Sequence, residues 1–178
     1  MATKKWVIDP THSEVQFKIK HLMITNVTGS FDTFQAEVET EEEDFMKAKV
    51  SFTANVDSIS TGNEQRDGHL KSADFFDTAT YPKIAFTATK FENVDNDGSF
   101  ELYGDLTMHG VTKNIKLDVE FGGVVKDPYG NTKAGFTING KIKRKDFGLN
   151  WDAVTEAGGI VVSDEVRIAC EIQLIEQQ

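Results

Sequence analysis

The sequence predicts an all-β protein, an eight-stranded antiparallel barrel with one short helix. Apolar and polar residues alternate with a period of two through most of the chain, which is the pattern of strands with one dry face. Turn signals such as "DPYGN" and "HG" separate successive segments. One wet and one dry face suit antiparallel sheets, and closure into a barrel removes exposed edges. A two-sheet sandwich is the alternative architecture.

Eight segments of the chain carry this alternation. In two of them the pattern changes parity, between Phe31 and Phe34 and after Ala88, as a β-bulge would cause. The predicted strands are residues 13–24, 29–39, 46–58, 83–91, 99–108, 111–125, 134–143 and 165–174.

One segment, at about residues 62–72, interrupts the period of two and predicts the helix. Thr61 and Glu64 have the spacing of a capping box, so the helix is expected to begin at Thr61. Gly68 costs a helix about 1 kcal/mol relative to Ala, which predicts a short helix held by packing. Its position between two strands suits a lid over one end of a barrel.

The composition is that of one globular domain, residues 1–178, with 39% hydrophobic residues and no linker-like stretch. The net charge of −10 would repel a polyanion, so nucleic acid is excluded as a partner. Cys170 is the only cysteine and cannot form an intrachain disulfide. Its place on the apolar face of a strand predicts a small buried hydrophobe.

The chain begins "MATKKWVIDP", with no apolar stretch of signal-peptide length and no later run long enough to span a membrane. As written, the sequence predicts a cytoplasmic protein. If a signal peptide has been removed, the same sequence predicts a periplasmic one.

The four histidines give no metal signature, because His12, His21, His69 and His109 are scattered without ligand spacing. The chain has no G-x-S-x-G elbow and no glycine-rich phosphate loop. Asp67 and His69 could form an acid–base pair, but no nucleophile accompanies them. The sequence therefore favours a protein without catalytic activity.

Several longer stretches resemble the YceI-like family. They are "WVIDPTHSEVQFKIKHL", "TGNEQRDGHLKSADFFDTATYPKIAF", "LYGDLTMHGVTKNIKLDVEF", "IKRKDFGLNW" and "VSDEVRIACEIQLI", which cover nearly the whole chain in order. The resemblance implies a lipocalin-like eight-stranded barrel with a helical excursion before its second half. It also implies an apolar ligand inside the barrel: a polyisoprenoid such as a prenylated quinone or polyprenyl phosphate, or a fatty amide. Family members often carry a secretion signal, which this chain lacks as written.

The residues of the predicted inner faces suggest how such a ligand would be held. Small residues could leave a slot between Phe17, Phe52, Phe86 and Phe136, or could merely ease packing and barrel bends. These small residues are Ala48, Ala54, Ala88, Gly104, Gly123 and Gly140. The expected apolar lining is Phe17, Ile19, His21, Phe31, Phe34, Phe52, Phe75, Phe76, Phe86, Leu106, Phe136 and Trp151.

Arg66, Asp67 and His69 are the expected polar rim. Arg66 could pair with a phosphate or quinone oxygen of the ligand head group, or could tie the helix to the barrel. For Asp67 the structural role is favoured, because its carboxylate would repel an anionic head group. His69 could donate one hydrogen bond to the head group.

Three hypotheses about function follow. The first is binding, sequestration or transport of a long apolar ligand without catalysis, requiring no cofactor other than the bound lipid. The second is an enzyme acting on a lipid or lipid phosphate through Asp67 and His69. The third is a stress or assembly scaffold without a ligand. The expected partner is a small lipid. Transient membrane contact for ligand exchange and formation of a homodimer are two further possibilities that the sequence leaves open.

Overall fold

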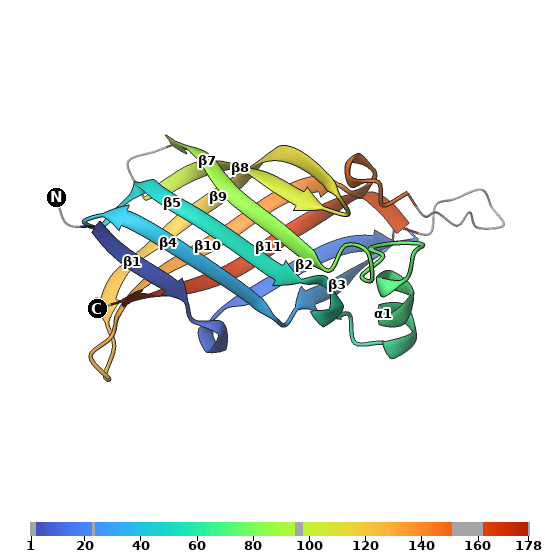
Figure 1. The fold of residues 1–178 in the computed structure, drawn as a ribbon, viewed down its shortest axis with the longest axis horizontal. Helices are drawn as coiled ribbons and strands as arrows, with labels where there is room; N and C mark the ends of the chain where they lie inside the picture. Colours follow the sequence, from blue (N-terminus) through green and yellow to red (C-terminus); the bar gives the residue numbers. More distant parts are fainter. Residues whose placement is uncertain (1–2, 23, 95–97, 151–161, 178) are drawn as a thin grey trace.

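Antiparallel strands form one continuous wall. The helix α1 lies at one end of it, and the start of β1 and the end of β11 lie at the other (Figure 1). The computed structural model describes residues 3–22, 24–94, 98–150 and 162–177. The strands are β1 Thr3–Ile8, β2 Glu14–His21, β3 Thr25–Phe31, β4 Phe34–Glu41, β5 Asp44–Asn55, β6 Ile59–Ser60, β7 Lys83–Asn93, β8 Ser99–Met108, β9 Val111–Lys126, β10 Thr132–Lys143 and β11 Val162–Gln177. The helix α1 spans Glu64–Lys71, and single 3-10 turns cover Pro10–His12, Val56–Ser58 and Arg144–Phe147.

The wall closes on itself because β1 pairs with both β4 and β11. The ring runs β1-β4-β5-β7-β8-β9-β10-β11 and back to β1, so eight strands close the barrel. β2, β3 and β6 pair side by side next to β11 and extend the wall toward the α1 end. The predicted eight-stranded antiparallel barrel is confirmed, and the sandwich alternative is wrong.

Three of the eight positions in the ring are each occupied by two successive strands. The chain breaks between β1 and β2, between β3 and β4, and between β5 and β6. Hydrogen bonds join the β3–β4 break to the β5–β6 break. The Asp32 N–H donates to the Ser58 carbonyl at 3.2 Å, and the Asn55 N–H donates to the Thr33 carbonyl at 2.9 Å. The parity change expected between Phe31 and Phe34 is therefore a strand break, while the one after Ala88 is a register shift between Ala88 and Lys90.

β1 is the strand that the alternation did not predict. It has only six residues, two of them lysines at its exposed start, so its periodic signal is short. Trp6 and Ile8 are nevertheless buried, and the Trp6 indole N–H donates to the Thr40 hydroxyl at 3.0 Å. Closure of the barrel depends on this strand.

The helix lies where the sequence predicted it, but its cap differs from the prediction. The Asn63 side chain accepts a hydrogen bond from the Arg66 N–H at 3.0 Å and caps the helix. Thr61, the expected cap, lies two residues earlier and instead binds the side chains of Arg66 and Asp67.

Candidate cavity and its mouth

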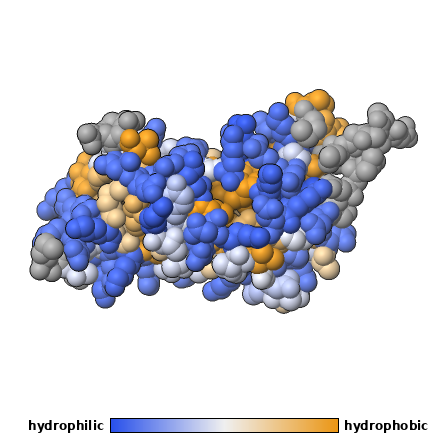
Figure 2. Space-filling model, turned by 90° about the horizontal axis from the view of Figure 1, so that it is seen from above, coloured by the Kyte–Doolittle hydropathy of each residue, from blue (hydrophilic) through white to orange (hydrophobic). Residues whose placement is uncertain are grey.

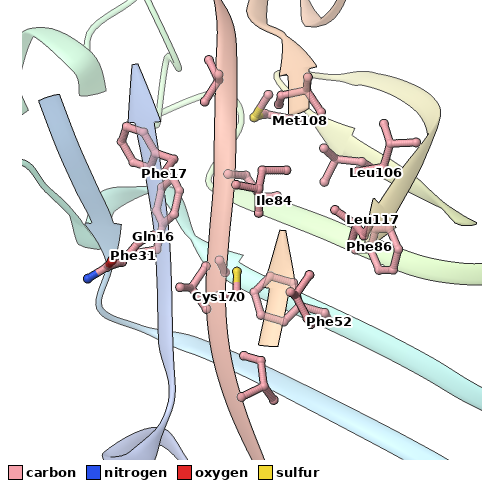
Figure 3. Close-up of a pocket in the computed structure, with 18 of the residues that line it drawn as sticks. Gln16, Phe17, Phe31, Phe52, Ile84, Phe86, Leu106, Met108, Leu117 and Cys170 are labelled. Carbon is pink, nitrogen blue, oxygen red and sulfur yellow. The ribbon is translucent and has the colours of Figure 1, made fainter. Parts of the chain in front are cut away.

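The barrel encloses a cavity of about 440 Å³. This volume lies in the range of about 300–1,000 Å³ that is typical of small-molecule sites. Side chains from opposite sides of the wall face one another across it, among them Phe17 of β2, Phe86 of β7, Leu106 of β8 and Phe52 of β5 (Figure 3). Because almost all of these side chains are apolar, the space offers water few hydrogen-bond partners and suits a hydrocarbon.

Most of the predicted lining residues reach this cavity. They do so because successive strand residues point to opposite faces, so the alternation in the sequence identifies the inner face. The residues concerned are Phe17, Ile19, His21, Phe31, Phe52, Phe75, Phe76, Phe86, Leu106 and Phe136. His21 is an exposed residue at the end of β2, so it lies at the edge of the cavity.

Phe34 and Trp151 were also predicted to line the cavity. Phe34 does not contribute to the lining; its ring stacks on Phe52 with 6.5 Å between centroids. Trp151 lies outside the described residues.

The small residues of the inner face divide into two groups. Ala48 and Ala54 line the cavity and so leave room inside the barrel. Gly104 and Gly140 do not line it, because the Phe86 ring and the Leu117 side chain occupy the space that a Cβ would take. Ala88 and Gly123 are also absent from the lining. Of the two alternatives that the sequence left open for the small residues, the packing role therefore holds at Gly104 and Gly140.

Aromatic rings form the floor of the cavity. Phe45 and Phe136 line it and meet edge to face, with 5.0 Å between their centroids. Trp6 and Phe121 pack against Phe45 at 5.1 and 5.4 Å. These rings pack together on the side away from α1, so among the described residues the α1 end is the better candidate for the entrance.

Polar side chains of the lining gather at that end. One set comes from β6–α1, and the other from the neighbouring ends of β2, β10 and β11, where His21 pairs with Val162. Gln16 is the exception further inside. The polar residues at the mouth are Lys20, His21, Thr61, Arg66, His69 and Arg144. The cavity therefore matches a molecule with a long apolar part and a polar end.

Arg66 and Asp67 fasten α1 to the segment before it through Thr61. The Arg66 Nε–H donates to the Thr61 hydroxyl and its Nη2 to the Thr61 carbonyl, both at 2.7 Å. Asp67 Oδ1 accepts from the Thr61 N–H at 2.9 Å and from its hydroxyl at 2.6 Å. Arg66 lines the mouth while Asp67 does not.

His69 also lies at the mouth, where its Nε2 is 3.0 Å from Asp74 Oδ2 and its ring meets Phe75 edge to face. Asp67 is engaged by Thr61, so the hypothesised Asp67–His69 acid–base pair is not formed among the described residues. Residues two positions apart on a helix do not face each other, which explains the separation.

Arg144 is a mouth residue that the sequence did not indicate. It is 2% exposed, and its guanidinium donates to the carbonyls of Ser163, Leu149 and Val162 at 2.9, 2.7 and 3.2 Å. It thereby ties the turn after β10 to the start of β11. A charged residue in "IKRKDF" ordinarily indicates a solvated turn, so no pattern distinguished Arg144 from its neighbours.

Cys170 faces the cavity from β11 (Figure 3). Burial raises the pKa of its thiol to about 11, so the group is protonated and a poor nucleophile near neutral pH. This agrees with the predicted role of a small hydrophobe.

A network of charged groups lies at the break between β1 and β2. Lys133 Nζ is 2.9 Å from Asp9 Oδ2, and His12 Nδ1 is 2.7 Å from the same oxygen. Burial acts to raise the pKa of Asp9, but the hydrogen bonds from Lys133, His12 and Thr11 outweigh it and hold the pKa well below its ordinary value. The hydrogen bond to Asp9 raises the pKa of Lys133.

Within the described residues, no group of three or more His, Cys, Asp and Glu side chains is placed to hold a metal ion. A search of the described residues also finds no helix with the length and apolar character needed to cross a bilayer.

The comparison with known families identifies the chain from its sequence. The model of the YceI-like domain matches residues 6–174. The chain belongs to the YceI-like family. A UPF0312 protein of Staphylococcus aureus is 41% identical over 164 residues, which are 91% of this chain and 92% of the relative.

Solved structures of similar proteins share the barrel. The YceI protein of Campylobacter jejuni is 37% identical, with a TM-score of 0.76 over 90% of this chain and 91% of that one. Two more distant structures establish likeness of fold alone. BcnA of Burkholderia cenocepacia has a TM-score of 0.80 at 22% identity, covering 93% of this chain and 98% of that one. A polyisoprenoid-binding domain from Saccharophagus degradans has a TM-score of 0.68 at 20% identity, covering 97% and 98%.

Proposed function

We propose that this protein binds and holds a long apolar molecule in its barrel, with a polyisoprenoid chain as the preferred class, and catalyses no reaction on it. The observation that carries the proposal is the cavity of about 440 Å³, apolar along its length and polar at its mouth. The name of the Saccharophagus degradans neighbour as a polyisoprenoid-binding domain supports the ligand class.

The energetics of burial favour such a ligand. Each buried CH₂ contributes about 0.8 kcal/mol, so ten buried carbons supply roughly 8 kcal/mol, which corresponds to micromolar affinity before ordering costs. A hydrophobic pocket discriminates weakly between chains that differ by one methylene. Selectivity should therefore come from the head group at the mouth.

Arg66 is the residue best placed to meet that head group. It lines the mouth, its Nε and Nη2 are held by Thr61, and Nη1 has no hydrogen-bond partner among the described residues. A guanidinium fixed in this way presents a preoriented donor to a phosphate or carbonyl oxygen. Arg66→Gln should weaken binding of a polyprenyl phosphate more than binding of the matching polyprenol.

The enzyme and scaffold hypotheses receive less support. Asp67 is engaged by Thr61 and lies outside the lining, so the acid–base pair that an enzyme would need is missing from the described mouth. A hollow apolar interior favours a binding function over a scaffold, which does not need one.

Native mass spectrometry and organic extraction of the purified protein test the proposal. We expect one co-purifying apolar molecule per chain, or stoichiometric uptake of an added polyprenol by the extracted protein, with no turnover of lipid esters or pyrophosphates. Absence of both a co-purifying ligand and uptake would overturn the binding function. Turnover that is lost in His69→Ala with the fold intact would establish the enzyme instead.

A further inference from the structure

Charge on the outer wall of β10, β11 and β2 is arranged in rows. The strand register places outward residues of the three strands directly opposite one another, and each row lies two residues further along the strands. From the floor toward the mouth, the rows change from acidic through neutral to basic. The three rows are Thr137–Glu171–Glu14, Asn139–Ala169–Gln16 and Lys141–Arg167–Lys18, and of the middle row Gln16 also borders the cavity.

The basic row is only partly neutralised by the protein itself. Like charges directly opposite one another on neighbouring strands are destabilising. Lys141 has one distant ion pair, 3.9 Å from Glu165, while Lys18 and Arg167 have none among the described residues. Lys20 and Lys143 continue the charge toward the mouth, also without ion pairs in the described chain. A protein of net charge −10 thus keeps a local surface of five cations, of which only Lys141 has an ion pair among the described residues.

An apolar tip lies beside this surface, in the connection between β2 and β3. The side chains of Leu22 and Ile24 are 40% and 78% exposed. Leu22 has φ of 54°, a left-handed turn position where Gly or Asn is usual. The outer surface is mostly hydrophilic, and apolar residues emerge on it in several places, in the middle of the molecule and at both ends (Figure 2).

Both features lie at the entrance of the cavity. His21 lines the cavity and immediately precedes Leu22, and Lys20 lines it as well. The acidic turn between β4 and β5 lies at the opposite end. A strand of the length of β11 spans about 50 Å at ~3.3 Å per residue, whereas the Debye length in physiological salt is about 8 Å. The distant acids therefore do little to offset the cations at the mouth, and Glu165, beside Lys141 and opposite Lys143, is the acid that offsets part of their charge.

We propose that this end of the barrel docks on an anionic lipid membrane. The tip, Leu22 and Ile24, enters the headgroup region, and the basic face contacts the lipid phosphates. The basic face consists of Lys18, Lys20, Lys141, Lys143 and Arg167. A protruding apolar tip beside a group of cations, most of them without an ion pair in the described chain, is complementary to an anionic bilayer, whose apolar layer lies just beneath its phosphates.

The geometry fits the thickness of the membrane interface. Lys20 and Lys18 lie two and four residues from Leu22, which is roughly 7 and 13 Å along an extended strand. An apolar tip inserted about 5–10 Å would bring Lys20 to the level of the phosphates and Lys18 within a Debye length of it. The mouth would then face the bilayer, so that an apolar ligand could pass between membrane and cavity without crossing water. This purpose rests on the proposed function, but the docking itself does not.

Flotation with lipid vesicles tests the docking. The full-length protein, with its lipid content extracted, is mixed with vesicles of phosphatidylcholine alone or of phosphatidylcholine and phosphatidylglycerol. We expect binding to the anionic vesicles, weakened by salt. Each cation near a membrane surface is worth about a fivefold change in partition, so Lys18→Gln/Arg167→Gln should bind about 25-fold more weakly. Leu22→Asn/Ile24→Ser should also reduce binding, and Asn suits the positive φ at position 22.

Matched variants at the other end separate this surface from general charge and hydrophobicity. Lys47→Gln/Lys126→Gln removes the same charge from exposed positions without ion pairs, and Val125→Ser removes an exposed apolar side chain. We expect both controls to bind as the unmodified protein does. The docking would be overturned if the controls lost vesicle binding equally, or if binding did not depend on anionic lipid. It would also be overturned if the unmodified protein bound no vesicles and the tip variant instead separated a dimer into single chains. Ligand uptake is measured separately from solution, so docking can fail while the proposed function stands, and the reverse.

Discussion

The Asp67 carboxylate holds Thr61 by two hydrogen bonds to a single oxygen, one from the backbone N–H at 2.9 Å and one from the hydroxyl at 2.6 Å. The Thr61 hydroxyl and carbonyl in turn accept from Arg66, so one threonine joins α1 to the strand before it. None of the residues of α1 is fully buried, so these polar contacts carry much of the attachment of the helix.

Asp67→Ala should loosen the helix over the mouth. Loss of the two charge-assisted hydrogen bonds is expected to cost about 1–3 kcal/mol. Amide hydrogen exchange over residues 61–71 should accelerate, while that of β8 and β9 stays slow. Glu64→Ala serves as the control, because it removes a carboxylate of the same helix that does not bind Thr61. Equal protection of the helix in both variants would show that Asp67 does not fasten it.

The depressed pKa of Asp9 predicts how the free energy of unfolding depends on pH. Its pKa is depressed in the folded protein, so its contribution is fully present above the ordinary value of 3.8 and is lost as the pH falls toward the folded value. Lys133 has the opposite sign: its raised pKa means stability present below 10.5 and lost at higher pH.

Asp9→Asn should therefore lower stability near neutral pH by about 1–3 kcal/mol and flatten the acid limb of the curve. Urea denaturation between acidic and neutral pH measures this. An acid limb of unchanged slope in Asp9→Asn would contradict the assignment.

Phe45 should set the depth of the cavity. Phe45→Ala removes the ring that meets Phe136 at the floor, so the cavity should deepen and accept longer chains, at a cost of about 3–5 kcal/mol in stability. Competition between polyprenols of different length, read by native mass spectrometry, should shift toward the longer one. Phe34→Ala, a phenylalanine outside the lining, is the matched control and should leave the preference unchanged. The same preference in Phe45→Ala would place the limit on chain length elsewhere.

Cys170 offers a probe of the interior. With a thiol pKa of about 11, the thiolate is only about one part in a thousand at pH 8, so alkylation should be slow and should accelerate as the pH rises. A bound apolar ligand should slow it further, because Cys170 faces the cavity. Labelling in denaturant provides the reference for a free thiol. If alkylation at pH 8 were rapid and its rate were unchanged by a bound ligand, the thiol would not face a dry interior.

The alternation of the sequence predicted the barrel and most of its lining for one physical reason. Strand residues point alternately to the two faces, so a residue such as Phe86 or Leu106 reveals its direction through its neighbours. What alternation does not reveal is how a neighbour fills a space. The sequence left open whether Gly104 leaves room or eases packing. The Phe86 ring covers it, and that contact depends on the register between β7 and β8.

The polar residues of the mouth were harder to predict. Arg66 and Asp67 are local to one helix, and the sequence indicated both their position and the structural role of Asp67. Arg144 gave no signal, because its partners are backbone carbonyls far along the chain that only the closed barrel brings together. β1 was missed for a related reason: its six residues become a strand through pairing with β4 and β11, which lie distant in sequence.

The most direct test of a hollow, ligand-holding barrel is to fill the space. Ala48 lines the cavity, while Ala85 on β7 does not, so Ala48→Phe and Ala85→Phe make the same change on different faces of the wall. The number of polyprenol molecules bound per chain, read by native mass spectrometry, should fall from one toward zero in Ala48→Phe and stay at one in Ala85→Phe. Full binding in Ala48→Phe, with the fold intact, would mean that the ligand does not occupy the barrel.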